Sequence, residues 1–375
     1  MKFSKNRRNT LRALTLAVAI AGIGAPVFAQ DDGEGSGLHH GKLFTITNSP
    51  QGNEVLVYSR AGQGPATLVT RAATQGIGTG AGLGSQGAVT LSGNGRHLFV
   101  VNAASNTITT FAVERDGLVL ASVVDSGGLT PTSVAESEGL VYVLNAGGSG
   151  NVAGFRNARG VLTPIASSAR GLSAAGGTAP AQVGFSSDGD ALIVSERNTN
   201  VLTSFSVRHD GTLDHRIATP TPGRTPFGFA VSKRDVLVLS EAATGSVSSF
   251  RLPEHGIAAP QAVSAALATT QGAPCWIAIT PNGRFAYSAN AASSSVSSFG
   301  IARDGALTLL AAQAAVTGPA AGALDLAVSP DGEQLSVFAS RSLQIVTYAI
   351  AEDGSLTPLG AVGGMPAGSA GLAVN

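Results

Sequence analysis

Two glutamates have the residue type and spacing best suited to acid–base chemistry in this sequence. Glu196 and Glu241 each close an apolar run, at 192–195 and at 237–240, so they occupy matching positions in two strand-like segments. Two carboxylates held close together raise the pKa of one of them, which sets a general acid beside a general base. We therefore predict that Glu196 and Glu241 form a catalytic acid–base pair.

A wider set of polar and aromatic residues is predicted to bind the substrate around this pair. Arg197 can hold a carboxylate or a phosphate through two parallel hydrogen bonds, and Trp276 can stack on a sugar ring. The full predicted substrate-binding set is Arg197, Gln182, Trp276, Asp325, Asn102, Asn145 and Asn290. A structural interpretation stays open, because Asn and Glu at strand ends commonly hydrogen-bond loop backbone groups. In that interpretation Trp276 is a packing plug and Asp325 caps a loop.

No metal ion and no organic cofactor are expected. The histidines do not show the spacing of a metal site, and the segment from Gly82 to Gly87 matches a dinucleotide fingerprint only in its glycines. That segment precedes a strand, whereas the fingerprint must open a helix. No Gly-x-Ser-x-Gly nucleophile motif occurs. Cys275, the single cysteine, is predicted to be a buried, unreactive thiol.

The composition excludes two classes of partner. Lys and Arg together number 23, as do Asp and Glu, so the net charge is zero and no basic surface for nucleic acid or an anionic membrane is expected. A single cysteine excludes a disulfide framework, so the hydrophobic core must hold the fold. We expect a monomer that binds a small, sugar-like molecule, with a protein partner on the same loops as the alternative.

The N-terminal segment is predicted to be an export signal. Residues 1–29 combine a basic start, an apolar run and the small-residue cleavage site Val27-Phe28-Ala29. Residues 30–42 are then a flexible leader, and residues 43–375 form a single domain. Sec export is the default route, while Arg7-Arg8 leaves the twin-arginine route open. We expect a periplasmic or secreted protein that does not insert in the membrane after cleavage.

An internal repeat supplies the elements that would position these residues. An apolar segment ending in Ser or Thr recurs at spacings of 45 to 49 residues, and its copies begin at Val89, Val134, Val183, Phe229, Ile277 and Leu326. An Asx-Gly turn such as Asn94-Gly95 leads into a second strand, and an Asp-Gly turn such as Asp304-Gly305 separates a third strand from a fourth. Each repeat is therefore a four-stranded antiparallel meander, and a period of this size indicates a radial repeat architecture.

The two ends of the repeat determine how many blades there are. Residues 43–48 match a second strand, and residues 371–375 match a first strand with nothing after it. The two ends together complete one blade, and six complete blades lie between them. The sequence thus predicts an all-β, seven-bladed β-propeller of four-stranded antiparallel blades, closed by the C-terminal strand in the N-terminal blade.

The repeat motifs resemble those of the lactonase (cycloisomerase 2) propeller family. They include Ser-Pro-Asp-Gly at 329–332, Val-Asn at 101–102, Leu-Asn at 144–145 and Asp-Gly-Ser-Leu-Thr-Pro-Leu at 353–359. Because that family includes 6-phosphogluconolactonases and carboxymuconate cyclases, the resemblance implies a seven-bladed fold and chemistry on lactone rings.

Two functions follow from different observations. The resemblance implies an exported lactonase, or a cycloisomerase-like enzyme, that opens a small sugar-derived or aromatic lactone at the top of the central channel. The Asp-Leu-Gly-type segment of the family has no match in this sequence. That difference favours the alternative, a non-catalytic propeller that binds a small ligand or a protein through the same loops.

Overall fold

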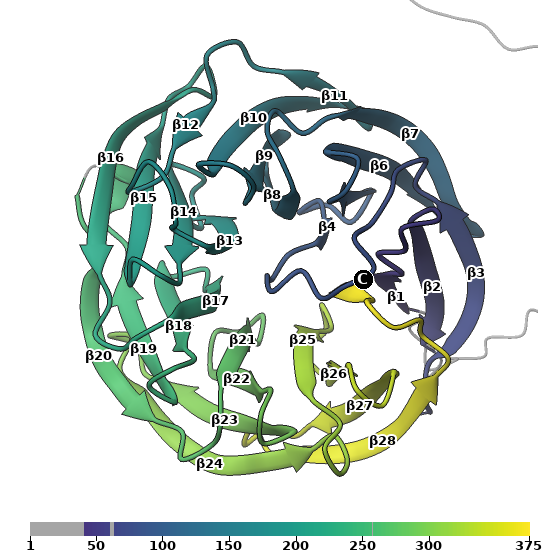
Figure 1. Ribbon diagram of the computed structural model, residues 1–375. Coiled ribbons are helices and arrows are strands. Elements are labelled where there is room, and N and C mark those ends of the chain that lie inside the picture. Colours follow the sequence, from purple (N-terminus) through teal and green to yellow (C-terminus); the bar gives the residue numbers. More distant parts are fainter. Residues whose placement is uncertain (1–40, 61–63, 257) are drawn as a thin grey trace, which may run out of the picture. The chain divides into compact units, whose positions relative to one another are not determined.

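The computed structural model describes residues 41–60, 64–256 and 258–375. These residues form seven antiparallel sheets arranged radially around one axis (Figure 1), which confirms the predicted all-β, seven-bladed propeller. The predicted export signal at 1–29, and the predicted leader up to residue 40, lie outside the described residues. The described part of the chain contains no helix long and apolar enough to cross a membrane.

The blades are called A to G in ring order, and their strands are given from the axis outward. Blade A contains β29 (Ala370–Val374), β1 (Gly41–Ile46), β2 (Glu54–Arg60) and β3 (Thr67–Ala73). Blade B contains β4 (Val89–Leu91), β5 (His97–Asn102), β6 (Thr107–Glu114) and β7 (Gly117–Asp125). Blade C contains β8 (Pro131–Ser137), β9 (Leu140–Asn145) and β10 (Asn151–Ala158), and its outermost position is divided between β11 (Val161–Pro164) and β12 (Arg170–Gly171).

The remaining four blades repeat the same order. Blade D contains β13 (Pro180–Phe185), β14 (Ala191–Glu196), β15 (Val201–Val207) and β16 (Leu213–Pro220). Blade E contains β17 (Pro226–Val231), β18 (Val236–Glu241), β19 (Ser246–Arg251), the short 3₁₀ turn η1 (Glu254–Gly256) and β20 (Gln261–Ala268). Blade F contains β21 (Pro274–Ile279), β22 (Phe285–Asn290), β23 (Ser295–Ile301) and β24 (Leu307–Val316). Blade G contains β25 (Ala323–Val328), β26 (Gln334–Ala339), β27 (Gln344–Ile350) and β28 (Leu356–Gly363).

Ring closure joins the two ends of the described chain, as predicted. Strand β29 pairs antiparallel with β1, with Leu43 opposite Val374 and Phe44 opposite Ala373. Asn375 extends this pairing, because its backbone N–H donates to the Lys42 carbonyl at 3.0 Å and its side-chain oxygen accepts from the Lys42 N–H at 2.6 Å. Blade A is therefore a complete four-stranded sheet.

Tight turns join the first and second strands of the blades. In blade B the Ser92 hydroxyl donates to the Asn94 side-chain oxygen at 2.8 Å, and that oxygen also accepts from the Arg96 N–H at 3.0 Å. Gly95 follows with a φ of 69°, a left-handed conformation that glycine adopts without a steric cost. The Asx-Gly pairs of the sequence thus work as predicted, with the glycine supplying the positive φ.

The core lies between adjacent blades, where the second strands are buried along most or all of their length. Every residue of β9, β14, β18 and β22 is buried, whereas the outermost strands alternate between half-buried and exposed positions. Large side chains such as Phe44, Phe99 and Phe155 are at most 1% exposed there. A blade alone cannot bury both of its faces, so radial packing of the blades provides this burial.

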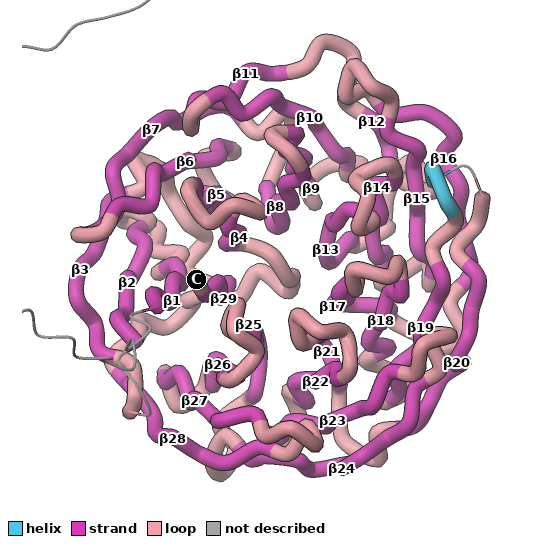
Figure 2. Tube along the Cα trace, turned by 180° about the vertical axis from the view of Figure 1, so that it is seen from behind, coloured by secondary structure: helices cyan, strands magenta, loops and turns pink. Residues whose placement is uncertain are grey.

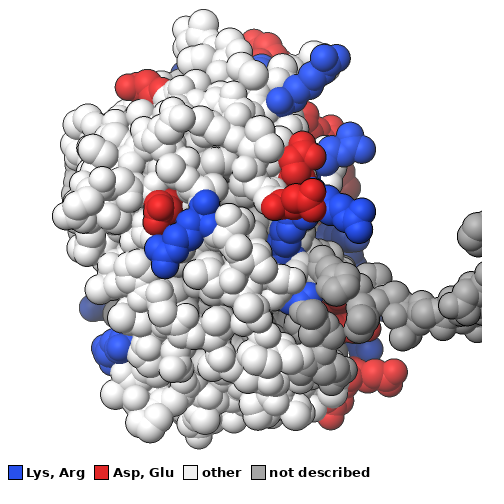
Figure 3. Space-filling view, turned by 90° about the vertical axis from the view of Figure 1, so that its right-hand side faces the viewer, with Lys and Arg blue, Asp and Glu red and all other residues white. Residues whose placement is uncertain are grey.

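The propeller has two faces that differ in their connections (Figure 2). We call one the loop face; it carries the links from each second strand to the third and from each fourth strand to the next blade. The turn face carries the tight hairpins. A side view of the molecule shows large uncharged areas, with charged side chains gathering toward one rim (Figure 3).

Candidate functional site

A segment of blade B crosses the central channel on the loop face. We call residues 83–87, just before β4, the axial segment; the link before β4 runs into the centre of the ring (Figure 1). The Gln86 side chain accepts from the Ile277 N–H at 3.0 Å and donates to the Ile277 carbonyl at 2.7 Å, in blade F. Its backbone N–H donates to the Ala181 carbonyl of blade D at 3.0 Å. The axial segment therefore bridges blades on opposite sides of the channel.

Glycine at position 228 makes room for this bridge. A Cβ atom added to Gly228 on β17 would lie 2.1 Å from the Gln86 side-chain oxygen and 2.6 Å from the Cys275 carbonyl. Any larger residue there would displace the Gln86 amide. The sequence analysis placed the substrate site at the top of the central channel, and the axial segment crosses the channel at this end (Figure 1).

Trp276 meets the axial segment and fills the space beside it. Its indole N–H donates to the Ser85 carbonyl at 3.0 Å, and its side chain is 5% exposed. The ring packs on Phe227 of blade E, with 4.9 Å between the ring centroids. Ser85 in turn donates its hydroxyl to the Thr132 carbonyl of blade C at 2.8 Å. Trp276 is thus a packing residue of the channel. Stacking of a ligand ring on the small exposed part of the Trp276 side chain stays a prediction.

Arg197 lies against the same aromatic pair. Its guanidinium carbon is 5.4 Å from the centroid of the Phe227 ring, and its Nε–H donates to the Ala179 carbonyl at 3.0 Å. Burial lowers the pKa of Arg197, and the nearby Cys275 acts in the opposite direction. Within the described residues, no carboxylate pairs with this guanidinium and its two terminal nitrogens have no hydrogen-bond partner. Arg197 is a half-buried cation whose terminal donors are free to bind an anion.

Position 84 leaves the guanidinium uncovered. A Cβ atom on Gly84 would lie 3.1 Å from a terminal nitrogen of Arg197, so a side chain there would cover the terminal donors.

Cys275 lies close enough to interact with Arg197 and is 8% exposed. Burial raises the pKa of its thiol to about 12, which keeps the thiol protonated and unreactive, as predicted.

The connections on the loop face contain few charged residues, and all of these are arginines. All fourteen connections on this face lie within the described residues, and they contain three charged residues, Arg197, Arg224 and Arg341. Glu196 and Glu241 end the strands that lead into two of these connections, but both are fully buried. The connections themselves are therefore positive, while Asp125 at the end of β7 and Glu54 at the start of β2 add accessible carboxylates at strand ends of this face. The guanidinium of Arg197 has no carboxylate partner in the described residues, which favours a ligand that carries negative charge there.

Asp325 stands at the inner-strand position that Gln182 and Trp276 occupy in other blades. One oxygen of its carboxylate accepts from the Gly371 N–H of blade A at 2.9 Å. The side chain is 4% exposed, and burial raises the pKa of Asp325 from 3.8 to about 7, only partly offset by that hydrogen bond. No cation pairs with it in the described part of the chain. Asp325 is thus a carboxyl group that can exchange a proton near neutral pH.

Gln182 takes part in the contact between blades D and E. Its side chain accepts from the Phe229 N–H at 2.7 Å and donates to the Phe229 carbonyl at 2.9 Å. This is the same pairing that Gln86 makes with Ile277, so two glutamine amides each take the place of a neighbouring strand. Gln182 remains half-buried, and one hydrogen of its amide NH2 has no partner in the described residues, so it can still donate to a ligand.

Glu196 holds the loop that enters its own blade. One carboxylate oxygen accepts from the Ser173 N–H at 3.0 Å and the Thr203 hydroxyl at 2.5 Å, while the other accepts from the Thr199 hydroxyl at 2.8 Å and from the Ser173 hydroxyl. The side chain is fully buried. These contacts match the structural interpretation that the sequence analysis left open for this residue.

Glu241 has the equivalent place in blade E. Its carboxylate accepts from the Gly223 N–H at 2.7 Å and from the Ser246 hydroxyl at 2.8 Å, and it is fully buried. Within the described residues, no hydrogen bond joins Glu241 to Glu196, since each bonds to groups of its own blade and the loop entering it. The proposed acid–base pairing of the two carboxylates therefore stays a prediction.

Three predicted asparagines occupy corresponding strand ends and are also fully buried. Asn102 accepts from Asn53 at 3.0 Å and Thr74 at 2.7 Å, and its amide donates to two threonine hydroxyls of β6. Asn290 donates to Ser295 and Ser297 at 3.1 and 2.9 Å. The Asn145 amide nitrogen donates to the Ser126 carbonyl at 3.0 Å, but its oxygen has no partner in the described chain.

Sequence reasoning missed Ser85, Gln86 and Phe227. The repeat register treats the residues before β4 as an ordinary loop, and a contact across the channel leaves no periodic pattern. One signal was present: Gly84 and Gly87 bracket these residues with positive φ values of 60° and 82°, immediately before a first strand of only three residues. Phe227 gives no local signal, because its partners come from other blades.

Comparison with known proteins places the chain in a family. The model of the family described as lactonase, 7-bladed beta-propeller, matches residues 149–259 and 243–370, which together cover more than half of the chain. The chain therefore belongs to the lactonase seven-bladed β-propeller family. A search of curated proteins gives no match.

Solved structures share the fold at low sequence identity. The periplasmic gluconolactonase of Pseudomonas aeruginosa is 19% identical, with a TM-score of 0.69 over 88% of this chain and 98% of that one. A candidate 6-phosphogluconolactonase of Bacteroides uniformis is 20% identical, with a TM-score of 0.71 over 88% and 98%. A protein from Lactobacillus plantarum is 17% identical, with a TM-score of 0.72 over 90% and 99%. At these identities the likeness concerns the fold.

Proposed function

We propose that this chain is an exported lactonase that hydrolyses a small sugar-derived or aromatic lactone on the loop face, at the mouth of the channel. The observation that carries the proposal is the free guanidinium of Arg197, set in a face whose connections contain no other charges than arginines. Family membership supports lactone chemistry in general. Export rests on residues 1–29, and the name of the Pseudomonas aeruginosa relative describes a periplasmic protein.

Arg197 would bind the oxygen that carries negative charge. Hydrolysis of a lactone converts its carbonyl oxygen to an oxyanion in the transition state, and fixed donors in a partly dry site stabilise such a charge. Stacking on Phe227 and the hydrogen bond to Ala179 hold the guanidinium plane in place. A carboxylate on the substrate would use the same two terminal nitrogens, in a bidentate pair.

Asp325 is the residue best suited to move a proton. Its deprotonated form would take a proton from water as the water oxygen attacks the carbonyl carbon; the ring C–O bond then breaks and the proton passes to the ring oxygen. A base works best when its pKa lies near the working pH, as the raised pKa of Asp325 allows. Arg197, Phe227, Trp276 and Asp325 belong to four consecutive blades, D to G, along one arc of the ring.

The original pair, Glu196 and Glu241, remains a second assignment of the acid and base. Their burial and hydrogen bonds support a structural part instead, because the carboxylate oxygens already accept from groups of their own blades and entering loops. The two assignments give different results in the same assay. Asp325→Asn removes the proton acceptor of the first, and the Glu196→Gln, Glu241→Gln double variant removes that of the second.

The test is ring opening of a panel of sugar-derived and aromatic lactones by the purified mature protein. We expect activity above the spontaneous rate, a rise in kcat as the pH passes about 7 because Asp325 must be deprotonated, and a loss of at least about 100-fold in Asp325→Asn. Arg197→Gln should lower kcat/KM, while Arg224→Gln, the matched change of an exposed arginine on the same face, should not. Wild-type activity no faster than the spontaneous rate on every lactone would end the hydrolase proposal.

Binding can be followed without catalysis. Trp276 is the single tryptophan of the chain and packs on Phe227 beneath Arg197, so its fluorescence reports on this site alone. The alternative function, a non-catalytic binding propeller, is supported by the axial segment, which crosses the channel and pairs with both backbone groups of Ile277. Fluorescence changes that saturate with a lactone or its hydroxy acid, without turnover, would establish that alternative.

A further inference from the structure

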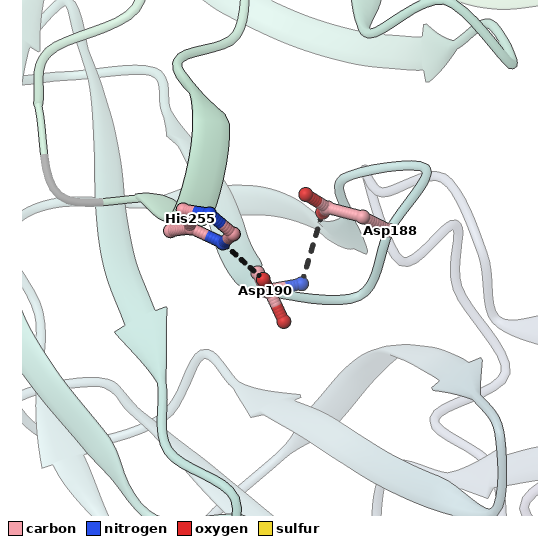
Figure 4. Close-up of side chains that lie close together, drawn as sticks. All are labelled: Asp188, Asp190 and His255. Carbon is pink, nitrogen blue, oxygen red and sulfur yellow. Dashed lines mark hydrogen bonds and ion pairs between the residues drawn. The ribbon is translucent and has the colours of Figure 1, made fainter.

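Three side chains that can bind a metal meet on the turn face, far along the sequence from one another. Asp188 and Asp190 lie in the turn between β13 and β14 of blade D, and His255 lies in η1 of blade E (Figure 4). One donor atom from each residue lies within 4.8 Å of the other two. Donors bound to one first-row ion at about 2.0–2.2 Å are at most about 4.4 Å apart, so small side-chain adjustments would complete the set.

We propose that Asp188, Asp190 and His255 form a site for a divalent transition-metal ion, Zn²⁺ in the first place, that links blades D and E on the turn face. One imidazole and two carboxylates suit Zn²⁺ and its neighbours, whereas Ca²⁺ and Mg²⁺ prefer oxygen ligands alone. The site is separate from Arg197 and Asp325, and nothing in it depends on lactone chemistry.

The hydrogen bonds of the cluster leave one donor atom of each residue available. Asp188 accepts from the Ser186 hydroxyl at 2.6 Å and the Asp190 N–H at 3.0 Å through a single oxygen, so its second oxygen is free. Asp190 bonds to Nδ1 of His255 at 2.8 Å through one oxygen and keeps the other. The Ser186 hydroxyl fixes the orientation of Asp188, as outer groups do around known metal ligands.

Negative charge surrounds this cluster from each element that packs there. Glu254 acts on His255 from η1 itself, Asp188 and Asp190 act from the β13–β14 turn, and Asp235 of the β17–β18 turn accepts from the Ser187 N–H at 2.7 Å. No lysine or arginine is among the groups that act on His255. This part of the turn face therefore carries negative charge that a bound cation would neutralise.

Protons and the metal compete for the imidazole. Nδ1 of His255 already faces an Asp190 oxygen at 2.8 Å. A metal ion binds a neutral imidazole, so metal binding weakens as the pH falls and protons occupy the ring nitrogens. The ion would replace an exposed ion pair, in which His255 is 74% and Asp190 44% exposed, by bonds that tie two blades together.

The sequence analysis expected no metal because no local spacing suggests one. Asp188 and His255 belong to different repeats, and only the packing of η1 against blade D brings them together. The cluster can therefore be recognised in the folded structure but not from the spacing of its residues in the sequence.

The test is calorimetric titration of ZnCl₂, with CaCl₂ and MgCl₂ as comparisons, into the mature chain at pH 7.5. All proteins carry His39→Ala and His40→Ala, because those adjacent histidines could bind zinc by themselves. We expect one Zn²⁺ per chain, a weaker response to Ca²⁺ and Mg²⁺, and weaker Zn²⁺ binding at pH 5.5. Asp188→Asn and His255→Asn should each lower the affinity at least about tenfold.

His209→Asn is the matched control, since His209 is also an exposed turn-face histidine, in the turn between β15 and β16. Its zinc affinity should equal that of the parent. Equal affinities of the parent and the His255→Asn variant, or no saturable binding in the parent, would overturn the proposal. Because the cluster is solvent-exposed, the variants should fold, and far-ultraviolet circular dichroism of each verifies it.

Discussion

The side-chain amide of Gln86 pairs with both backbone groups of Ile277, although the two residues belong to blades B and F on opposite sides of the ring. The amide takes the place that a strand would occupy. A single polar side chain therefore connects the two halves of the propeller through its centre.

Gln86→Leu should lower the free energy of unfolding by about 2–4 kcal/mol. Leucine has a similar volume, but it leaves the Ile277 N–H and carbonyl without partners in a buried place, and each unsatisfied group costs about 1–3 kcal/mol. Urea unfolding followed by Trp276 fluorescence measures the change. Gln261→Leu, on exposed β20, is the control and should shift the midpoint little. Similar midpoints for the two variants would show that the bridge does not stabilise the ring.

Gly228→Ala should act on the same bridge from the other side. The added methyl group would lie 2.1 Å from the Gln86 oxygen, so the amide must leave Ile277. We expect a destabilisation of about 1–3 kcal/mol and a loss in the Gly228→Ala, Gln86→Leu double variant that is smaller than the sum of the two single losses. Gly176→Ala is the control, since nothing lies within 4 Å of its added Cβ. Additive losses in a double-mutant cycle would contradict a shared cause.

Asp325 should make stability fall as the pH rises. Its pKa is raised to about 7 in the folded chain, against 3.8 ordinarily, so between those values the folded state binds more protons than the unfolded state. The stabilisation is complete below pH 4 and is lost as the pH rises through 7. Asp325→Asn keeps an acceptor for Gly371 and does not ionise, so it should exceed wild-type stability at pH 8 by up to about 4 kcal/mol and match it near pH 4. Parallel stability curves for the two proteins from pH 4 to 8 would refute this assignment.

Glu196→Ala should destabilise the fold more than Glu241→Ala. The first change removes the acceptor of four hydrogen bonds, and the second the acceptor of two. We expect losses of about 3–5 and 2–3 kcal/mol, because buried donors lose partners and hydrogen bonds to charged groups are worth about 1.5–3 kcal/mol each but do not add fully. Denaturant midpoints check the order. The reverse order, or no loss of stability, would show that the hydrogen bonds of these carboxylates do not stabilise the fold.

Much of the scaffold could be predicted because each blade carries its own local signals. The second strand predicted after the Asn94-Gly95 turn is β5, His97–Asn102, and β22, Phe285–Asn290, follows Asn282-Gly283 in the same way. An apolar run between two turn motifs leaves little choice of register. The closing strand was also predictable, because the first blade visibly lacks one strand and the chain ends on one.

The candidate site was harder to predict, because its members meet only through the ring. Arg197 could be named from its strand-end position, but its stacking partner Phe227 and the absence of a paired carboxylate are facts of packing. Glu196 and Glu241 are buried because loops fold back over the ends of their strands. The sequence showed only that both residues are glutamates at strand ends, which suggested acid–base chemistry. The raised pKa of Asp325 comes from desolvation, which no spacing of residues reveals.

The pairing of β29 with β1 also governs the order in which the molecule can form. Lys42 and Asn375, which bond to each other, are 333 positions apart, whereas the strands inside each of blades B to G are close neighbours in sequence. Local hairpins form quickly and distant contacts slowly, because closing a long loop costs more chain entropy. We therefore expect the meanders of blades B to G to assemble first and blade A to complete last. Until that final step, both open edges of an unfinished ring are exposed to other chains.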